Sequence, residues 1–229
     1  MKNINTIYKI GGNVLMNLKK ISIIMIILAI ICGITVISAA TQEETTANDI
    51  LNQNNSQNSN ILIVYFSRTG ENYNVGNTEV GNTAMIASYM KEYLKADSYE
   101  IIPVNKYPTG YDECLDIAKK EQQENSRPEI QNKVENIDKY DTIIIGYPIW
   151  YGDTPMIINT FLEQNNLEGK TILLFNTHEG SQDAGTYNKI AEKLSSSKVN
   201  TNGLSVQGQT ARTPEGKQKT IDWLKNQGY

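Results

Sequence analysis

The chain has 229 residues, of which 39% are hydrophobic and 20% charged, and its 25 acidic side chains outnumber its 21 basic ones. This length suits one compact domain with appendages, and the acidic balance disfavours nucleic acid as a partner. A single His and two Cys, of which only Cys114 lies outside the N-terminal segment, exclude a structural zinc site and a disulfide framework within a mature chain. No carboxylate spacing typical of an EF-hand occurs, so the sequence predicts no metal site.

The first 40 residues have the pattern of a signal peptide or an N-terminal membrane anchor. Lys19 and Lys20 precede an uncharged run over residues 21–37, and small side chains end the run before a cleavage point after Ala40. The run is also almost long enough to span a bilayer, with the Lys pair on the inner side. Both alternatives predict an extracytoplasmic domain, secreted or anchored to the cytoplasmic membrane, that contacts the membrane only through this segment.

Two further features belong to the N-terminal region. Met16 is a more natural start than Met1, because a basic segment normally opens a signal of this kind. Residues 41–60 are rich in Asn and Gln and poor in apolar side chains, so burial cannot offset the entropy of ordering them. They are predicted to form a flexible tether, and the folded domain is predicted to occupy residues 61–229.

From residue 61 onward, apolar runs alternate with helical patterns. The predicted strands cover residues 61–66, 99–104, 142–147, 171–176 and 203–206. The predicted helices cover residues 83–95, 111–125, 155–163, 186–195 and 214–226. Asp153-Thr154-Pro155 is expected to start the third helix, with a capping side chain followed by Pro155 in the first turn. Apolar runs are typical of strands buried on both faces, and the alternation predicts a doubly wound five-stranded parallel sheet with helices on both faces.

Such a fold binds its ligand beyond the carboxyl ends of the strands, so the loops there are the candidate site. After the first strand and at the start of the next helix lie hydroxyl, glycine and amide residues, namely Ser67, Arg68, Thr69, Gly70, Gly81, Asn82 and Thr83. At a helix start they can hold a phosphate dianion, because backbone N–H groups and the helix dipole favour an anion. The alternative is a polar turn with an ordinary cap, and no Gly-Lys-Ser/Thr or Gly-x-Gly-x-x-Gly motif is present.

The loop after the third strand contains two large aromatic residues at a position expected to be exposed. Its residues are Pro148, Ile149, Trp150, Tyr151 and Gly152. A flat aromatic ligand stacked on Trp150 or Tyr151 would explain them, since offset stacking adds to the energy of burial. The alternative is that Trp150 folds back onto a neighbouring helix.

The loop after the fourth strand is polar and contains the single His. Its residues are Thr177, His178, Glu179 and Gly180. His178 could orient a ligand, donate a proton or only hydrogen-bond the loop, and a lone His is more often structural.

Taken together, these loops resemble the flavodoxin family, and in particular a flavodoxin-like branch with a Gly-Tyr-Pro-Ile-Trp signature, here at residues 146–150. The resemblance covers residues 61–229 in order, including motifs such as Tyr107-Pro108 and Phe161-Leu162. It implies the sheet order 2-1-3-4-5 and FMN as the cofactor.

The same resemblance implies roles for individual residues. The phosphate would be held by Ser67, Thr69, Asn82 and Thr83. The isoalloxazine ring would lie between residues 148–152 and 177–180. The phosphate motif is split here by residues 70–80, and Asn77-Thr78 repeats Asn82-Thr83, so either pair could meet the phosphate. The second pair is favoured because a helical pattern continues from it.

The predicted function is that of an FMN-binding electron-transfer protein, whose partner is a redox protein or a small-molecule electron acceptor. The alternative is an NAD(P)H-dependent FMN quinone reductase, which the absence of a second nucleotide motif disfavours. A hydrolase with Ser67 or Cys114 as nucleophile ranks last, because no Gly-x-Ser-x-Gly motif occurs.

Overall fold

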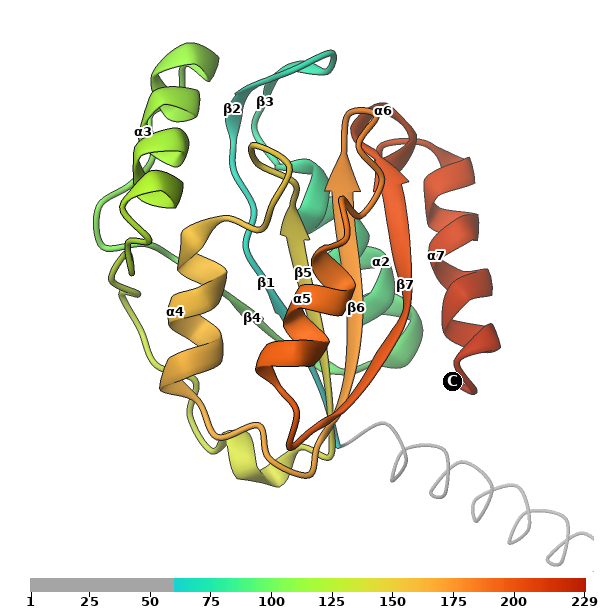
Figure 1. Ribbon diagram of the computed structural model, residues 1–229. Helices are drawn as coiled ribbons and strands as arrows, with labels where there is room; N and C mark the ends of the chain where they lie inside the picture. Colours follow the sequence, from blue (N-terminus) through green and yellow to red (C-terminus); the bar gives the residue numbers. More distant parts are fainter. Residues whose placement is uncertain (1–59) are drawn as a thin grey trace, which may run out of the picture. The chain divides into compact units, whose positions relative to one another are not determined.

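A five-stranded parallel sheet forms the centre of the described part of the chain, residues 60–229 of the computed structural model (Figure 1). The strands lie in the order β4-β1-β5-β6-β7, which is the expected 2-1-3-4-5 order when only these five are counted along the chain. Their bounds are Ile61–Tyr65 (β1), Asp97–Glu100 (β4), Thr142–Pro148 (β5), Thr171–His178 (β6) and Lys198–Gln207 (β7). The doubly wound α/β fold is therefore confirmed.

The predicted signal or anchor, the start at Met16 and the Asn/Gln-rich tether up to residue 59 lie outside the described residues. Within residues 60–229, each helix is too short or too polar to cross a membrane.

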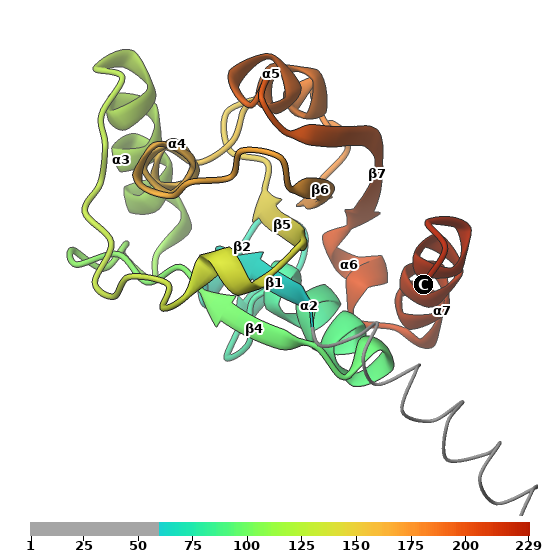
Figure 2. The ribbon, with the colours of Figure 1, turned by 90° about the horizontal axis from the view of Figure 1, so that it is seen from below.

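Helices cover both faces of the sheet (Figure 2). Their bounds are Asn82–Leu94 (α2), Tyr111–Gln123 (α3), Met156–Gln164 (α4), Thr186–Lys193 (α5), Gly208–Ala211 (α6) and Pro214–Asn226 (α7), with a 3-10 turn at Ile137–Lys139 (η1). One apolar cluster joins α4 and α5 to the sheet, and a second joins α2, α6 and α7 to the opposite face. Helix α3 packs mainly against α4 and the strand β2 (Gly70–Asn72), and it stands beside the edge of the sheet where the ligand loops lie (Figure 1).

The alternation of side chains along the central strands builds both clusters at once. In β5, Ile143 and Ile145 face one cluster and Ile144 faces the other, and all three are fully buried. Burying an Ile side chain contributes about 1.5–3 kcal/mol, so these strands hold the loop-bearing edge rigid. The next residue, Gly146, has to be glycine because the ring of Phe175 packs directly over its Cα. A Cβ at this position would lie 1.9 Å from that ring.

The structure differs from the predicted elements at the second strand. β4 pairs with β1 only over Asp97–Glu100, not residues 99–104, because Pro103 has no N–H to donate and the chain leaves the sheet to bridge Ile130 instead. A second difference is an antiparallel hairpin of β2 and β3 (Gly76–Thr78) between β1 and α2, which was not predicted.

The predicted cap of α4 was wrong. The helix begins after Pro155 without a side-chain cap. The Asp153 carboxylate accepts a hydrogen bond from the N–H of Thr154 and forms an ion pair with Lys189. Asp153 instead closes a tight turn with Trp150, in which each residue donates its N–H to the other's carbonyl.

Candidate functional site

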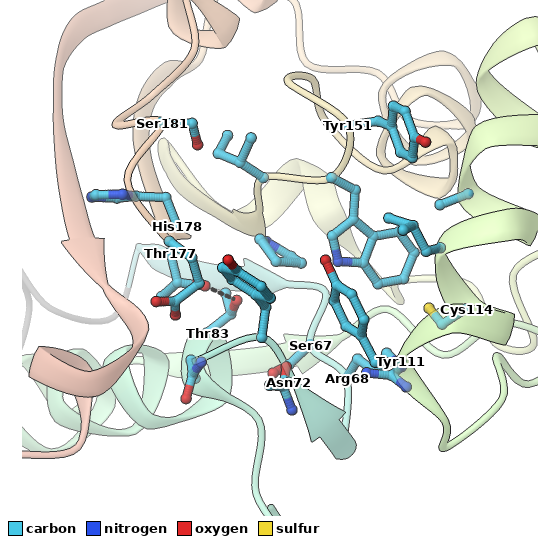
Figure 3. Close-up of a pocket in the computed structure, with 18 of the residues that line it drawn as sticks. Ser67, Arg68, Asn72, Thr83, Tyr111, Cys114, Tyr151, Thr177, His178 and Ser181 are labelled. Carbon is cyan, nitrogen blue, oxygen red and sulfur yellow. Dashed lines mark hydrogen bonds between the residues drawn. The ribbon is translucent and has the colours of Figure 1, made fainter. Parts of the chain in front are cut away.

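A cavity of about 280 Å³ opens where the loops after β1, β5 and β6 meet (Figure 3). Most of the predicted binding residues line it, namely Ser67, Arg68, Asn82, Thr83, Pro148, Ile149, Trp150, Tyr151, Gly152, Thr177, His178 and Glu179. Three predicted residues do not line it. Thr69 and Gly180 are exposed, and Gly70 is buried against the backbone of Thr109, where a Cβ would lie 2.6 Å from the carbonyl oxygen.

One end of the cavity is polar and lies at the start of α2. The hydroxyls of Thr83 and Thr177 share a buried hydrogen bond of 2.8 Å (Figure 3), and the hydroxyl of Ser67 accepts a 3.0 Å bond from the N–H of Ala84. The residue before the helix, Gly81, has no side chain with which to cap it. Only glycine fits at this position, because a Cβ would lie 2.2 Å from the Ser67 hydroxyl oxygen. The helix start and its dipole therefore face the cavity with hydroxyls around them, which suits an anion.

Of the two candidate Asn-Thr pairs, only Asn82-Thr83 lines the cavity. Asn77 and Thr78 lie on β3, where the Thr78 hydroxyl accepts a bond from the side chain of Asn72.

Arg212 is a cation at this polar end that the sequence analysis missed. Its Nη1 donates to the side-chain oxygen of Asn82 at 2.9 Å and to the carbonyl of Val80 at 2.8 Å. The guanidinium thus lies beside the first residue of α2, where its charge adds to the helix dipole. No local signal could have found it, because it is 130 residues away from Asn82 along the chain.

Glu179 is the acidic side chain of the same region. Its Oε2 atom is buried without a hydrogen-bond partner among the described residues, and burial raises the pKa of its carboxyl. The other carboxylate oxygen, Oε1, and the Asn82 side chain both pack against Gly208. A Cβ on Gly208 would lie 2.0 Å from Glu179 Oε1 and 2.4 Å from Asn82 Nδ2. Burial thus disfavours the charged form of this carboxyl.

The other end of the cavity is aromatic. The ring of Trp150 lies edge-on to Phe66, with centroids 5.3 Å apart, and to Tyr107 at 4.9 Å. Trp150 therefore packs against the rings of Phe66 and Tyr107, and it forms part of the cavity wall together with residues of α3. Tyr151 and Gly152 both have left-handed φ values of 52° and 70° in the tight turn that follows, and Tyr151 is 46% exposed.

Further lining residues come from elements that the sequence analysis did not connect with the site. Tyr73 belongs to the β2–β3 hairpin, and Tyr111, Cys114, Leu115 and Ala118 lie on α3. The rings of Tyr73 and Tyr111 lie 5.7 Å apart at an interplanar angle of 31°. The apolar face of α3 was visible in its spacing of Cys114 and Ala118, but not what it covers.

His178 is a buried, neutral side chain at the polar end. Its Nδ1 accepts a 2.9 Å hydrogen bond from the N–H of Gly180, so the ring proton is on Nε2. Burial and the nearby charge of Lys219 lower the pKa of the imidazole. A lowered pKa keeps the ring neutral at neutral pH, which fits the orienting role better than that of a proton donor.

Comparison with known proteins places the chain in one family. The sequence model of flavodoxin matches residues 60–227. A solved protein of Bacteroides eggerthii DSM 20697, assigned as a flavoprotein, is 30% identical with a TM-score of 0.58, over 73% of this chain and 96% of its own. A second such protein, from Bacteroides uniformis ATCC 8492, is 27% identical with a TM-score of 0.60, over 73% and 98%.

A flavoprotein from Lactobacillus acidophilus NCFM, solved in complex with FMN, is 24% identical with a TM-score of 0.52 and covers 66% of this chain and 95% of its own. At that identity the likeness concerns the fold. A search of curated proteins finds no match.

Proposed function

This chain belongs to the flavodoxin family, and on that premise we propose that it is an electron-transfer protein with FMN as its cofactor. FMN supplies the redox chemistry when bound, and the protein holds it and adjusts its electronic properties. The single observation that supports this function best is one cavity with two chemically distinct ends, polar at the start of α2 and aromatic beside Trp150.

The residues present fit FMN. The hydroxyls of Ser67 and Thr83 and the start of α2 would hold the phosphate, because each favours a dianion. Arg212 does not line the cavity, but it bonds to the side chain of Asn82 and adds its positive charge to this end. Trp150 would cover the ring at the aromatic end, whereas Thr177 lies beside Thr83 at the polar end. The cavity volume of about 280 Å³ lies just below the range of about 300–1,000 Å³ that is typical of ligand pockets.

The walls of the cavity favour a carrier over a reductase. Arg68 is the one permanent cation among its lining residues, and its guanidinium already bonds to backbone carbonyls. A pyrophosphate of NAD(P)H would therefore lack a cationic partner there. The competing function, an NAD(P)H:quinone reductase, is supported by the exposed Tyr73 and Tyr151, which could stack on a flat acceptor.

We further propose that the domain works outside the cytoplasmic membrane and exchanges electrons there with a redox protein or a small-molecule acceptor. The proposal is supported by the sequence of residues 1–40, with its Lys pair before an uncharged run.

Reduction kinetics test the carrier function without knowledge of the partner. The purified full-length protein, loaded with FMN, is mixed with NADH or NADPH in a stopped-flow instrument, and its potential is titrated with redox dyes. A carrier is expected to take up electrons in two resolved one-electron steps and to be reduced only slowly by either nucleotide. Rapid stoichiometric reduction by a nucleotide, followed by turnover on a quinone, would assign the reductase function instead.

A further inference from the structure

The guanidinium of Arg68 is surrounded by backbone carbonyl groups. Its Nε and Nη2 atoms donate to the carbonyl of Pro108 at 3.0 and 2.9 Å. Nη2 also donates to the carbonyls of Thr109 and Gly110 at 2.7 and 2.8 Å. Nη1 donates to the carbonyl of Glu71 on β2. All these partners lie on the inserted hairpin or on the loop before α3, and none lies at the start of α2.

These bonds join the hairpin and the start of α3 into one wall. The N–H of Glu71 donates to the carbonyl of Thr109 at 2.8 Å, and the Glu71 carboxylate accepts from the N–H of Tyr111 at 3.2 Å. Across the same junction, the rings of Tyr73 and Tyr111 pack together. Figure 3 shows Arg68 beneath Tyr111 and on the same side as Cys114, away from Thr83 and Thr177. The wall therefore closes the aromatic end of the cavity.

The bonds of Arg68 stabilise its charge without neutralising it. Carbonyl oxygens carry only partial charges, and none of the ion pairs between described residues includes Arg68. The charge is felt inside the cavity, because it lowers the pKa of the Cys114 thiol, although burial raises that pKa to about 11 overall. The aromatic end thus contains a fixed cation in a protein that is acidic as a whole.

Other titratable or charged groups around the cavity lie on each element that surrounds it. They are Glu71 and Tyr73 on the hairpin, Tyr107 before α3, Tyr111, Cys114, Lys119 and Glu121 on α3, Tyr151 after β5, and His178 and Glu179 after β6. Lys119 is exposed and lies 5.8 Å from the ring of Tyr151, where solvent screens it. Glu179 is at the polar end. Glu121 on α3 is half-buried like Arg68 and accepts a 2.8 Å hydrogen bond from the Tyr107 hydroxyl, and its effect on the pKa of the Cys114 thiol is opposite to that of Arg68 and smaller.

Building on the proposed function, we propose that Arg68 is a positioning residue with a second role: its fixed positive charge stabilises the reduced, anionic form of the bound FMN. Fully reduced flavin loses a ring proton and becomes an anion as the pH rises. A cation in a partly desolvated wall favours that anion and lowers the pKa at which it forms. The charge does not act on neutral reduced flavin, so its effect on the potential depends on pH.

Two substitutions at Arg68 separate charge from position. Arg68→Lys keeps the charge but cannot bridge three successive carbonyls and the hairpin, and Arg68→Gln loses the charge. Arg127→Gln is the matched control, because Arg127 is a surface residue whose charge is already paired with Glu163. The midpoint potential of each FMN-loaded full-length protein is measured by dye equilibration from acid to alkaline pH.

We expect Arg68→Gln to have a more negative potential than the wild type at alkaline pH, by about 30 mV for each tenfold loss of preference for reduced FMN. The difference should vanish at acid pH, and the bend in the plot of potential against pH should move to higher pH. Arg68→Lys should keep the wild-type bend while it binds oxidised FMN more weakly. Arg127→Gln should not differ from the wild type.

A Gln variant with the wild-type bend, or a Lys variant that moves the bend as far as Gln does, overturns the role of charge. Should Arg68→Gln fail to fold, Arg68→Met takes its place as the variant without charge: a bend moved to higher pH supports the proposal, and the wild-type bend overturns it. These outcomes are distinct from failure of the proposed function, which would appear as a wild-type protein that does not bind FMN.

Discussion

Replacing Thr83 with Val removes a hydroxyl from the polar end of the cavity and leaves its shape almost unchanged. The Thr83 side chain is buried, and its hydroxyl shares the 2.8 Å bond with Thr177. With Val in its place, the Thr177 hydroxyl is left buried without that partner, which costs about 1–3 kcal/mol of folding free energy. The urea midpoint of the FMN-free protein should fall accordingly.

The same change should weaken FMN binding far more than riboflavin binding. When Thr177 donates to Thr83, the Thr83 hydroxyl is free to donate to the phosphate. A hydrogen bond to a charged group contributes about 1.5–3 kcal/mol, or about 10- to 150-fold in Kd. Riboflavin has no phosphate and should lose none of this.

Quenching of flavin fluorescence on titration with FMN-free protein measures both affinities. Thr83→Ser is the control, because it keeps the hydroxyl and should bind FMN within a few-fold of the wild type. Equal losses of FMN and riboflavin affinity in Thr83→Val would mean that Thr83 does not meet the phosphate, and the reasoning about the polar end would be refuted.

Three more outcomes are expected. Trp150→Ala should weaken FMN and riboflavin alike, by about 1–3 kcal/mol in fluorescence titrations, through lost stacking and burial; a loss confined to FMN would contradict this. Gly146→Ala should lower the free energy of unfolding in urea by about 1–3 kcal/mol, since its Cβ would overlap the ring of Phe175; an unchanged midpoint would contradict the packing. Because burial raises the pKa of Glu179, the folded state binds its proton more tightly than the unfolded chain, and stability should fall as pH rises from the unfolded value of about 4.3 through the folded one. Glu179→Gln should reduce that fall in urea titrations between pH 4 and 8, and an identical pH profile would argue against it.

The central strands were determined by the sequence itself. Continuous apolar runs mark β1, β5 and β6 within two residues, because a strand covered by helices on both faces needs apolar side chains in succession. Their alternation with helical patterns determined the fold class, and the topology then placed the ligand loops at one edge. These predictions succeed because each local hydrophobic pattern is compatible with only one type of secondary structure in this fold.

The hairpin was not predictable in this way. Its strands, Gly70–Asn72 and Gly76–Thr78, are short and consist of glycine and polar residues, so they carry no hydrophobic period. What stabilises the hairpin is its contact with the loop before α3 through Arg68, about 40 residues away along the chain.

The direction of the charged side chains was likewise decided only by the tertiary structure. The sequence placed Arg68 in a ligand loop, but the fold turns its guanidinium toward carbonyls of another segment, and it brings Arg212 from near the C-terminus to the start of α2. A long flexible side chain has several partners within reach of its backbone position. Which of them it bonds depends on segments that only packing brings together, and no local pattern records that choice.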